Sequence, residues 1–398
     1  MADEIDQDPR AENFVQDPYP FYARMRRQGR AFFWKQYGHL CVPGFEDVNA
    51  LLRDRRFGRQ VLHKTTRKAL GWPEPDPKLA DFHAVERHSL LELEPPDHTR
   101  LRTLVNRAFV SRHVERLRPR ITTLARELID RFPAGPVDLL EAYATPLPVR
   151  VIAALLGVDE GTAPQLLDWS HRLVAMYQFR RSAAEEALAN AAAIEFSEFI
   201  RAEMARALKS PGDDLLSLLV RAEGLSEPEI ISTVILLLNA GHEASVHAIG
   251  NGVKAILQSG AKPGELFATP ATTAATVDEI LRYDPPLHMF TRYALEDVEI
   301  GGVRLKIGDV VGLMLGAANR DPARYGDPER FDPQRDASGH TSFGAGIHFC
   351  LGAPLARLEI EVALPILFQR LPGLRLGEAP RYRDTYHFHG LERLLLER

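Results

Sequence analysis

The segment Phe343-Gly344-Ala345-Gly346-Ile347-His348-Phe349-Cys350-Leu351-Gly352 is the most informative stretch of the 398-residue chain. It places one cysteine among three glycines, and glycine lets a backbone turn tightly and pass close to a ligand because it has no Cβ. Pro354 then precedes an apolar run with helical spacing, so a helix is expected to begin just after the thiol. A sulfur at a helix N-terminus is favoured as thiolate, and the segment therefore predicts a thiolate ligand beside a flat prosthetic group.

A cysteine in an arbitrary protein is more often a buried structural residue, so the surrounding pattern has to carry the interpretation. The spacing F-x2-G-x3-C-x-G is expected by chance only roughly 0.0005 times in a sequence of this composition. The segment resembles the haem-binding loop of the cytochrome P450 family, in which the cysteine thiolate is the proximal iron ligand. The resemblance implies haem b as the cofactor, Cys350 as the metal ligand, and Phe343, Gly344 and Gly352 as further cofactor contacts.

Composition sets the broad class. The net charge is −5 with 45% hydrophobic residues, which gives ample core and no sign of a nucleic-acid partner. Only Cys41 and Cys350 are present, too few for a disulfide framework, and a buried strand position is expected for Cys41. The N-terminus is acidic and no apolar run is long enough for a membrane span. We expect a soluble cytoplasmic monomer, with no membrane partner and with residues 1–398 forming a single domain.

Hydrophobic periodicity predicts a mainly α chain with a small β part. Helices are expected over five ranges: 99–109, 114–132, 148–156, 183–208 and 227–257. Strands are expected in a hairpin over 31–34 and 39–42 and again over 298–300, 303–305 and 309–315. Residues 62–92 are polar and proline-rich and are expected to form a long loop. The resemblance, not the periodicity, names the cytochrome P450 fold.

Two further motifs support the resemblance. Glu279 and Arg282 lie three residues apart on one predicted helix face, which alone would describe an ordinary surface ion pair. Their position before the cysteine loop resembles the family's Glu-x-x-Arg motif. Arg335 follows in the segment that resembles the source of the second arginine of a Glu-Arg-Arg network. These three residues are expected to be structural.

The two propionates of a haem require charged donors when they are buried. His98 and Arg102 lie four apart after Asp97, on one face of a predicted helix. Arg292 and His348 resemble the family's remaining propionate donors. Any one of these residues could be an ordinary surface cation, but the four in this order favour a propionate-binding set.

The helix expected over 227–257 contains the main departure from the family. The segment Ala240-Gly241-His242-Glu243-Ala244-Ser245 resembles the oxygen-activating segment, in which the helix widens and an acid is followed by threonine. Gly241 allows two interpretations, close helix packing or a local opening. Glu243 supplies the acid, but Ala244 replaces the threonine, and Ser245 lies about 100° further round the helix.

Oxygen activation consumes protons, and a positioned alcohol orders the water that delivers them. Three explanations for Ala244 remain open. A hydroxyl group of the substrate could order the water, Ser245 or His242 could do so through a rearranged network, or activation could be inefficient. We favour the first, and we assign the catalytic set to Glu243, Ala244 and Ser245.

The resemblance also implies a substrate pocket and an external electron donor. The pocket is expected to be lined by Ala240, Leu287, His288, Met289, Phe290 and Phe388. The chain has no flavin, nicotinamide or iron–sulfur motif, so a ferredoxin or flavodoxin is expected as a separate donor. Four arginines around the thiolate elements could form its docking patch or an ordinary solvated surface: Arg100, Arg107, Arg112 and Arg357.

The sequence therefore predicts a haem-thiolate monooxygenase that inserts one atom of O2 into a small or medium-sized organic substrate. Two alternatives remain. One is a peroxide-driven or coupling-type reaction of the same family, and the other is a haem-thiolate binding or sensing protein without turnover.

Overall fold

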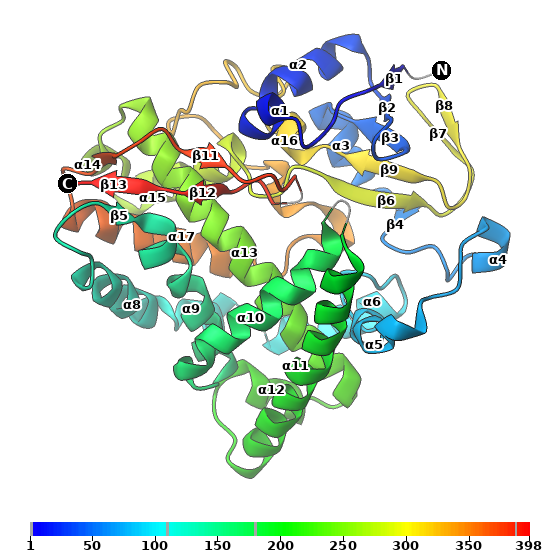
Figure 1. Cartoon of the computed structure of the whole chain (residues 1–398), viewed down its shortest axis with the longest axis horizontal. Helices are drawn as coiled ribbons and strands as arrows, with labels where there is room; N and C mark the ends of the chain where they lie inside the picture. The colour runs from blue at the N-terminus through cyan, green and yellow to red at the C-terminus, as the bar shows by residue number, and fades with distance from the viewer. Residues whose placement is uncertain (1–2, 109–110, 179–180, 387) are drawn as a thin grey trace.

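The computed structural model describes residues 3–108, 111–178, 181–386 and 388–398. Figure 1 shows a helical body in the lower part of the view, with the larger sheet at the upper right and the C-terminal strands at the upper left. The fold is therefore mainly α with a small β part, as predicted.

Eight helices of eleven or more residues build the body. They are α6 Asp97–Ala108, α8 Arg118–Asp130, α9 Pro146–Leu156, α10 Ala163–Val174, α11 Ala183–Lys209, α13 Glu227–Ser259, α15 Pro270–Tyr283 and α17 Ala353–Arg370. The shorter helices are α1 Glu12–Gln16, α2 Tyr19–Gln28, α3 Phe45–Leu51, α4 Arg67–Leu70, α5 Ala80–Glu86, α7 Ser111–Glu115, α12 Leu215–Arg221, α14 Pro263–Leu266 and α16 Leu315–Ala318. None of them is long and apolar enough, within the described residues, to cross a membrane.

The central helix α13 begins and ends where its sequence dictates. At its start Glu229 accepts a hydrogen bond from the backbone N–H of Ser226 at 2.9 Å, which completes a capping box. At its end Gly260 adopts a left-handed conformation that stops the helix. The helix contacts α9, α10, α15 and α17, so apolar residues around its whole circumference are buried.

The main sheet has the strand order β1-β2-β3-β9-β6-β4. Its strands are β1 Glu4–Ile5, β2 Phe32–Trp34, β3 His39–Val42, β4 Phe57–Gly58, β6 Phe290–Ala294 and β9 Val310–Leu313. The remaining strands are β5 Val137–Asp138, β7 Val298–Ile300, β8 Val303–Leu305, β10 Arg375–Leu376, β11 Arg381–Tyr382, β12 Leu391–Arg393 and β13 Leu395–Glu397. The predicted β2–β3 hairpin is present, and Cys41 is a buried strand residue.

The prediction of a structureless loop over residues 62–92 is wrong. This segment contains α4 and α5. The hydroxyl of Thr66 accepts a hydrogen bond from the backbone N–H of Ala69 and caps α4. The side chain of Asn190 on α11 accepts hydrogen bonds from the first N–H groups of α5 at 3.1 and 3.0 Å. The periodicity of so short a segment could not show these partners, because one lies more than a hundred residues away.

Candidate functional site

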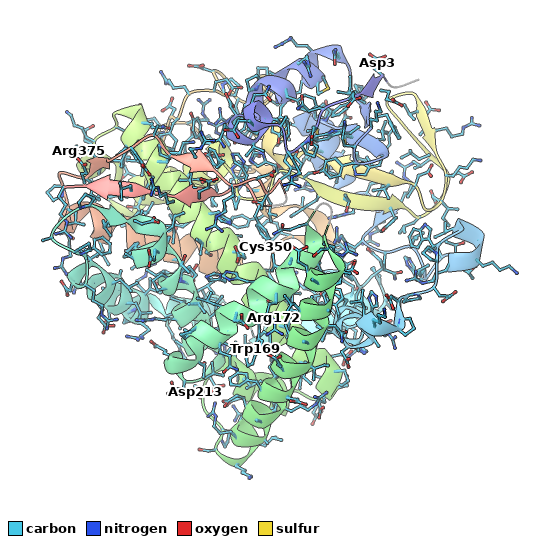
Figure 2. The ribbon with its side chains drawn as sticks, viewed as in Figure 1. Asp3, Trp169, Arg172, Asp213, Cys350 and Arg375 are labelled. Atoms are coloured by element: carbon cyan, nitrogen blue, oxygen red, sulfur yellow. The ribbon has the colours of Figure 1, made fainter. Side chains whose placement is uncertain are left out.

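The cysteine loop leads directly into α17, as predicted from Pro354. Cys350 lies near the middle of the molecule in the view of Figure 2, and its backbone N–H donates to the carbonyl of Phe343 at 2.9 Å. Gly344 and Gly346 have φ values of 66° and 70°. A Cβ on Gly346 would lie 2.5 Å from the carbonyl oxygen of Leu52, so both its conformation and its surroundings require glycine there.

The electrostatics of Cys350 differ from the expectation that the helix terminus alone would favour a thiolate. Burial raises the pKa of the thiol, although hydrogen bonds from the backbone N–H groups of Gly352 and Ala353 and the charge of Arg102 oppose this effect. Desolvation outweighs these contributions. Without a ligand in the site, Cys350 is therefore favoured as the neutral thiol.

The four predicted propionate donors lie on elements that meet beside the cysteine loop. His98 and Arg102 come from the first two turns of α6, and the His98 and His348 rings are 4.4 Å apart. Arg102 donates to the carbonyl oxygen of Phe349 at 2.8 Å, which links α6 to the loop. Arg292 lies on β6, paired with Val311 of β9.

Two of these residues are buried polar groups without an adequate partner. Neither ring nitrogen of His98 has a hydrogen-bond partner. Arg292 is only 3% exposed, and its Nη1 donates to the carbonyl of Thr291 at 2.9 Å, but it forms no ion pair with a carboxylate among the described residues. Burial lowers the pKa of Arg292 to about 9, with the charge of Arg59 adding to the effect. An unsatisfied buried imidazole and a buried guanidinium without a counter-charge are costly, and an anionic ligand group between them would satisfy both.

The sequence reasoning missed two residues of this region. Glu94 accepts hydrogen bonds from His348 at 3.2 Å and from the backbone N–H of Arg59 at 2.5 Å. Burial alone would raise the pKa of Glu94, but these hydrogen bonds hold it below its usual value. The Arg59 guanidinium pairs with Glu92 and donates to the carbonyl of Thr291. No sequence signal pointed to either residue, because both act through contacts between distant segments.

Glu279, Arg282 and Arg335 come together as a buried network. Arg282 and Glu279 are fully buried and form a bidentate pair, with N–O distances of 2.7 and 2.8 Å. Arg335 Nε lies 3.7 Å from Glu279 Oε1. The Arg282 guanidinium also donates to the carbonyls of Asn319 and Pro328, so it fastens α15 to the segment that precedes the cysteine loop.

The helix α13 runs without interruption through residues 240–245, so it shows no local widening. A Cβ on Gly241 would lie 2.9 Å from Cδ1 of Ile152, which favours the close-packing interpretation of this glycine. Ser245 is buried and lies beside Glu359 of α17, where it opposes the rise in the pKa of that carboxyl. The side chains of Ala244 and Ser245 therefore lie on different faces of α13.

Glu243 is held by histidines. His171 Nε2 on α10 lies 2.9 Å from Glu243 Oε1, and His247 Nε2 lies 3.5 Å from Oε2. Burial alone would raise the pKa of Glu243, but these partners hold it well below its usual range. The pKa of His171 is raised by the same contact. His242 is buried with its Nε2 3.3 Å from the carbonyl of Thr145.

The side chains of the predicted pocket residues do not all have the same surroundings. Ala240, Leu287, Met289, Phe290 and Phe388 all retain accessible surface, and Phe290 lies against the position of Gly344. Met289 packs with the N-terminal aromatic cluster near Trp34, on the opposite side from Phe290, because neighbouring residues of an extended chain alternate in direction. The His288 ring is fully buried and held by Tyr22. Neither Met289 nor His288 gains support as a pocket residue.

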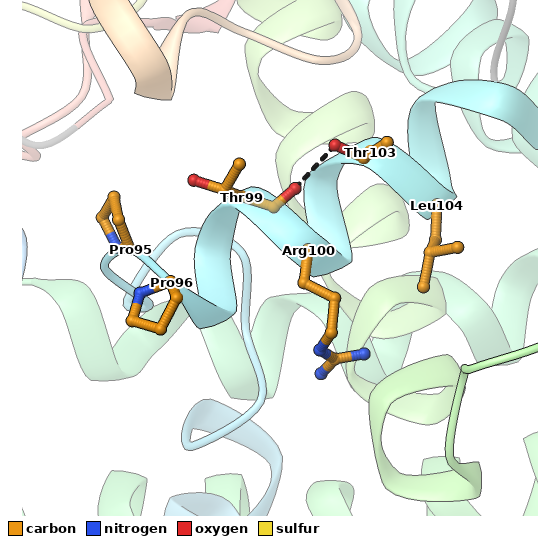
Figure 3. A pocket seen from close by; sticks show the side chains of 6 residues that line it. All are labelled: Pro95, Pro96, Thr99, Arg100, Thr103 and Leu104. Carbon is orange, nitrogen blue, oxygen red and sulfur yellow. Dashed lines mark hydrogen bonds between the residues drawn. The ribbon is translucent and has the colours of Figure 1, made fainter.

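A separate hollow lies on the side of α6 and does not include Cys350 (Figure 3). It is lined by Pro95, Pro96, Thr99, Arg100, Thr103 and Leu104. Thr103 donates back to the carbonyl of Thr99 at 2.7 Å, and Arg100 pairs with Glu229. The polar groups of this hollow are thus engaged within the protein.

Comparison with known proteins agrees with this geometry. A sequence model described as cytochrome P450 matches residues 271–372, the part that holds the Glu-Arg network and the cysteine loop. The chain is 39% identical to cytochrome P450 107B1 of Saccharopolyspora erythraea, over 96% of this chain and 95% of the relative. The chain belongs to the cytochrome P450 family.

Other relatives carry the same P450 assignment. The 6-deoxyerythronolide B hydroxylase of the same organism is 39% identical, over 93% of this chain and 92% of the relative. The biotin biosynthesis cytochrome P450 of Bacillus subtilis is 35% identical, over 96% and 97%. A crystal structure of P450BioI in complex with a hexadec-9Z-enoic acid ligated acyl carrier protein superposes with a TM-score of 0.90 at 35% identity, covering 97% of this chain and 99% of that one.

As a P450 monooxygenase, the protein binds haem b and uses O2, a small-molecule substrate and a redox partner. The residues present fit that cofactor, because the Cys350 thiol, glycines in a tightly packed loop, the unsatisfied His98 ring and the buried Arg292 guanidinium lie in one region. When bound, the haem supplies the iron at which O2 is activated for transfer of one oxygen atom. Cys350 would hold the iron, and His98, Arg102, Arg292 and His348 would hold the propionates.

Proposed function

We propose that this P450 monooxygenase hydroxylates a substrate whose own hydroxyl group orders the proton-delivering water beside Ala244. The single observation that carries the proposal is that the two polar neighbours of this position lie toward other elements of the protein. Ser245 lies beside Glu359 of α17, and His242 Nε2 lies 3.3 Å from the carbonyl of Thr145. Alanine at 244 offers no hydroxyl, so the missing donor has to come from the ligand.

Glu243 and His171 are the groups of the chain that supply protons to this region. The His171 side chain is 57% exposed, whereas that of Glu243 is 11% exposed. His171 Nε2 donates a proton toward Glu243 Oε1 and exchanges protons with solvent on its exposed side. The low pKa of Glu243 keeps its carboxylate ionised and able to orient a water molecule.

The test compares Ala244→Thr with Ala244→Val, since valine has the shape of threonine without its hydroxyl. With the native substrate, both variants should change the fraction of reductant that appears as product, because the side chain enters the space of the ordered water. With a substrate analogue that lacks the hydroxyl, threonine should restore coupling and valine should not. Unchanged coupling of Ala244→Thr with the native substrate contradicts the proposal, provided that the haem spectrum is intact.

We further propose a substrate of the acyl or polyketide class. Support comes from the relatives, which include a polyketide biosynthesis cytochrome P450 and the 6-deoxyerythronolide B hydroxylase, and from the neighbour whose structure contains an acyl chain on a carrier protein. Leu287, Phe290 and Phe388 provide apolar surface that suits such a molecule. The experiment is a spectral titration with fatty acids, their carrier-protein thioesters and macrolactones. Tight binding of only small polar compounds would exclude this class.

We propose a ferredoxin or flavodoxin as the electron donor, docking beside the cysteine loop. Ile347 and Phe349 expose 36% and 42% of their surfaces there, and Arg107 is exposed on α6. Two other arginines of the expected patch are already paired, Arg100 with Glu229 and Arg357 with Asp278, and the side chain of Arg112 lies outside the described residues. Arg107→Glu should slow reduction by an acidic carrier, more so at low salt. An unchanged rate removes Arg107 from the docking surface.

We also propose that residues 1–398 form a single domain that acts as a cytoplasmic monomer. The solved neighbour that covers 97% of the chain, and the presence of only two cysteines, support this arrangement. Sedimentation of the haem-loaded protein tests it, and a stable dimer would contradict it.

A further inference from the structure

A second cluster of metal-ligating side chains lies away from the cysteine loop, where the connection between α15 and β6 meets the C-terminal segment. Asp284 follows the end of α15, His288 precedes β6, and His389 belongs to the C-terminal segment before β12. Their candidate ligand atoms lie within 4.8 Å of one another. Asp284 Oδ1 is 3.5 Å from His389 Nε2 and 4.0 Å from His288 Nε2.

The two imidazoles present unsatisfied nitrogens to this cluster. Nε2 of His288 and Nε2 of His389 are buried and have no hydrogen-bond partner. Unpaired buried polar atoms cost free energy, so their retention calls for a ligand. His288 is 0% and His389 is 4% exposed, and a neutral imidazole binds a metal through its free ring nitrogen.

The Asp284 carboxylate supplies the negative charge. Burial alone would raise its pKa, but Lys254, whose Nζ lies 3.7 Å from Oδ2, opposes this effect. Tyr19 donates to Asp284 Oδ1 at 2.8 Å, and the hydroxyl of Tyr382 donates to Oδ2. The carboxylate is therefore ionised and fixed in orientation.

Outer contacts also position the histidines. His288 Nδ1 lies 2.7 Å from the hydroxyl of Tyr22, which leaves Nε2 free to bind a metal. The His389 ring stacks on Tyr382 with a centroid distance of 3.8 Å. The side-chain amide of Asn251 donates to the backbone carbonyls of Asp284 and His389 at 3.2 and 3.0 Å, which holds the two segments together. A preorganised ligand set with such support is typical of metal sites.

We propose that Asp284, His288 and His389 bind a divalent transition-metal ion of the zinc class. Two imidazoles and one carboxylate are a common ligand set for zinc, whereas calcium and magnesium prefer oxygen ligands. Zinc bonds of about 2.1 Å in tetrahedral geometry require ligand separations of about 3.4 Å, so small ring movements would close the site. The bound ion would cross-link the connection between α15 and β6 to the C-terminal segment.

Two cations limit the affinity. Lys254 Nζ lies 3.7 Å from Asp284 Oδ2, the oxygen that also accepts a hydrogen bond from Tyr382. Arg320, which pairs with Glu329, adds positive charge near His389. Removing the nearer charge should therefore strengthen metal binding. Lys254→Met is predicted to tighten zinc binding, which an ordinary buried polar cluster would not show.

The test uses the haem-loaded full-length protein, treated with a chelator and then desalted. Zinc is added, and its content per protein is measured by elemental analysis, with affinity from calorimetric titration. One zinc per protein is expected, lost in His288→Gln and in His389→Gln. Tyr22→Phe should weaken binding by about 10- to 100-fold, because it removes only an outer contact.

The matched control is His171→Gln, which alters the other group of potential ligands, formed with His242 and Glu243. It should leave zinc stoichiometry and affinity unchanged. No zinc above background in the wild-type protein, or zinc lost in His171→Gln but kept in His389→Gln, overturns the proposal. Should a glutamine variant lose its haem, Tyr22→Phe and Lys254→Met decide the question, since they must shift the zinc affinity in opposite directions. This inference does not depend on the substrate or the electron donor.

Discussion

Glu359 on α17 should make the stability of this protein depend on pH. The carboxyl is 1% exposed, and neither oxygen has a hydrogen bond of regular geometry. Burial raises its pKa to about 8 from the value of 4.5 expected in an unfolded chain, with only a small opposing contribution from Ser245. The folded protein therefore holds one more proton than the unfolded chain between these two pH values.

The sign and size follow from that extra proton. Its contribution to stability is fully present below pH 4.5 and is lost as the pH rises through 8. The slope is about 1.4 kcal/mol per pH unit, which amounts to about 2.5 kcal/mol between pH 5 and pH 7. Glu359→Gln keeps the shape and remains neutral, so its free energy of unfolding should exceed that of the wild type by an amount that grows with pH.

Urea unfolding followed by far-ultraviolet circular dichroism at several pH values measures this difference. Glu361→Gln is the matched control, because Glu361 lies on the same helix but is 26% exposed and lies 3.8 Å from Arg118. The difference in free energy of unfolding between Glu361→Gln and the wild type should change much less with pH. A gap for Glu359→Gln that stays constant from pH 5 to pH 8 would refute the assignment of a buried, protonated carboxylic acid.

Three further predictions concern the haem-side framework. Arg282→Met leaves Glu279 buried without its bidentate partner, so we expect a loss of about 3–5 kcal/mol of stability, seen as a lower yield of folded, haem-containing protein. Arg292→Leu should lower the haem retained after gel filtration, whereas Arg292→Lys should keep more of it because the charge remains; equal retention in both would argue against a propionate contact. Gly346→Ala should reduce haem incorporation, since a Cβ there would lie 2.5 Å from the carbonyl oxygen of Leu52, and normal incorporation would show that the loop tolerates a shift.

The sequence anticipated much of the fold because the longer helices have strong apolar periodicity and identifiable ends. The helix predicted over 227–257 is α13, Glu227–Ser259, and the predicted β2–β3 hairpin is present. The helix α5 escaped prediction because it depends on Asn190 and on packing against α11, and α4 escaped it because it is a single turn of four residues.

The sequence could indicate which residues belong to the site, but it was a poorer guide to where their side chains point. Glu279 and Arg282 lie three apart on a helix, so their pairing follows from helical geometry. Met289 and His288 were expected beside the substrate, but their neighbours fix them toward the N-terminal aromatic cluster. No pattern within one segment could supply those neighbours, which include Trp34 and Tyr22.

By itself, the sequence determined the helical class, the thiolate loop, the Glu-Arg network and the absence of an alcohol at Ala244, since each depends on residue type and short spacing. Only the tertiary structure decided that Ser245 faces Glu359, that Glu94 binds His348, and that Asp284 meets two buried histidines. The physical reason is that burial, pKa and unsatisfied hydrogen bonds depend on atoms brought from distant parts of the chain, and local spacing does not specify those atoms.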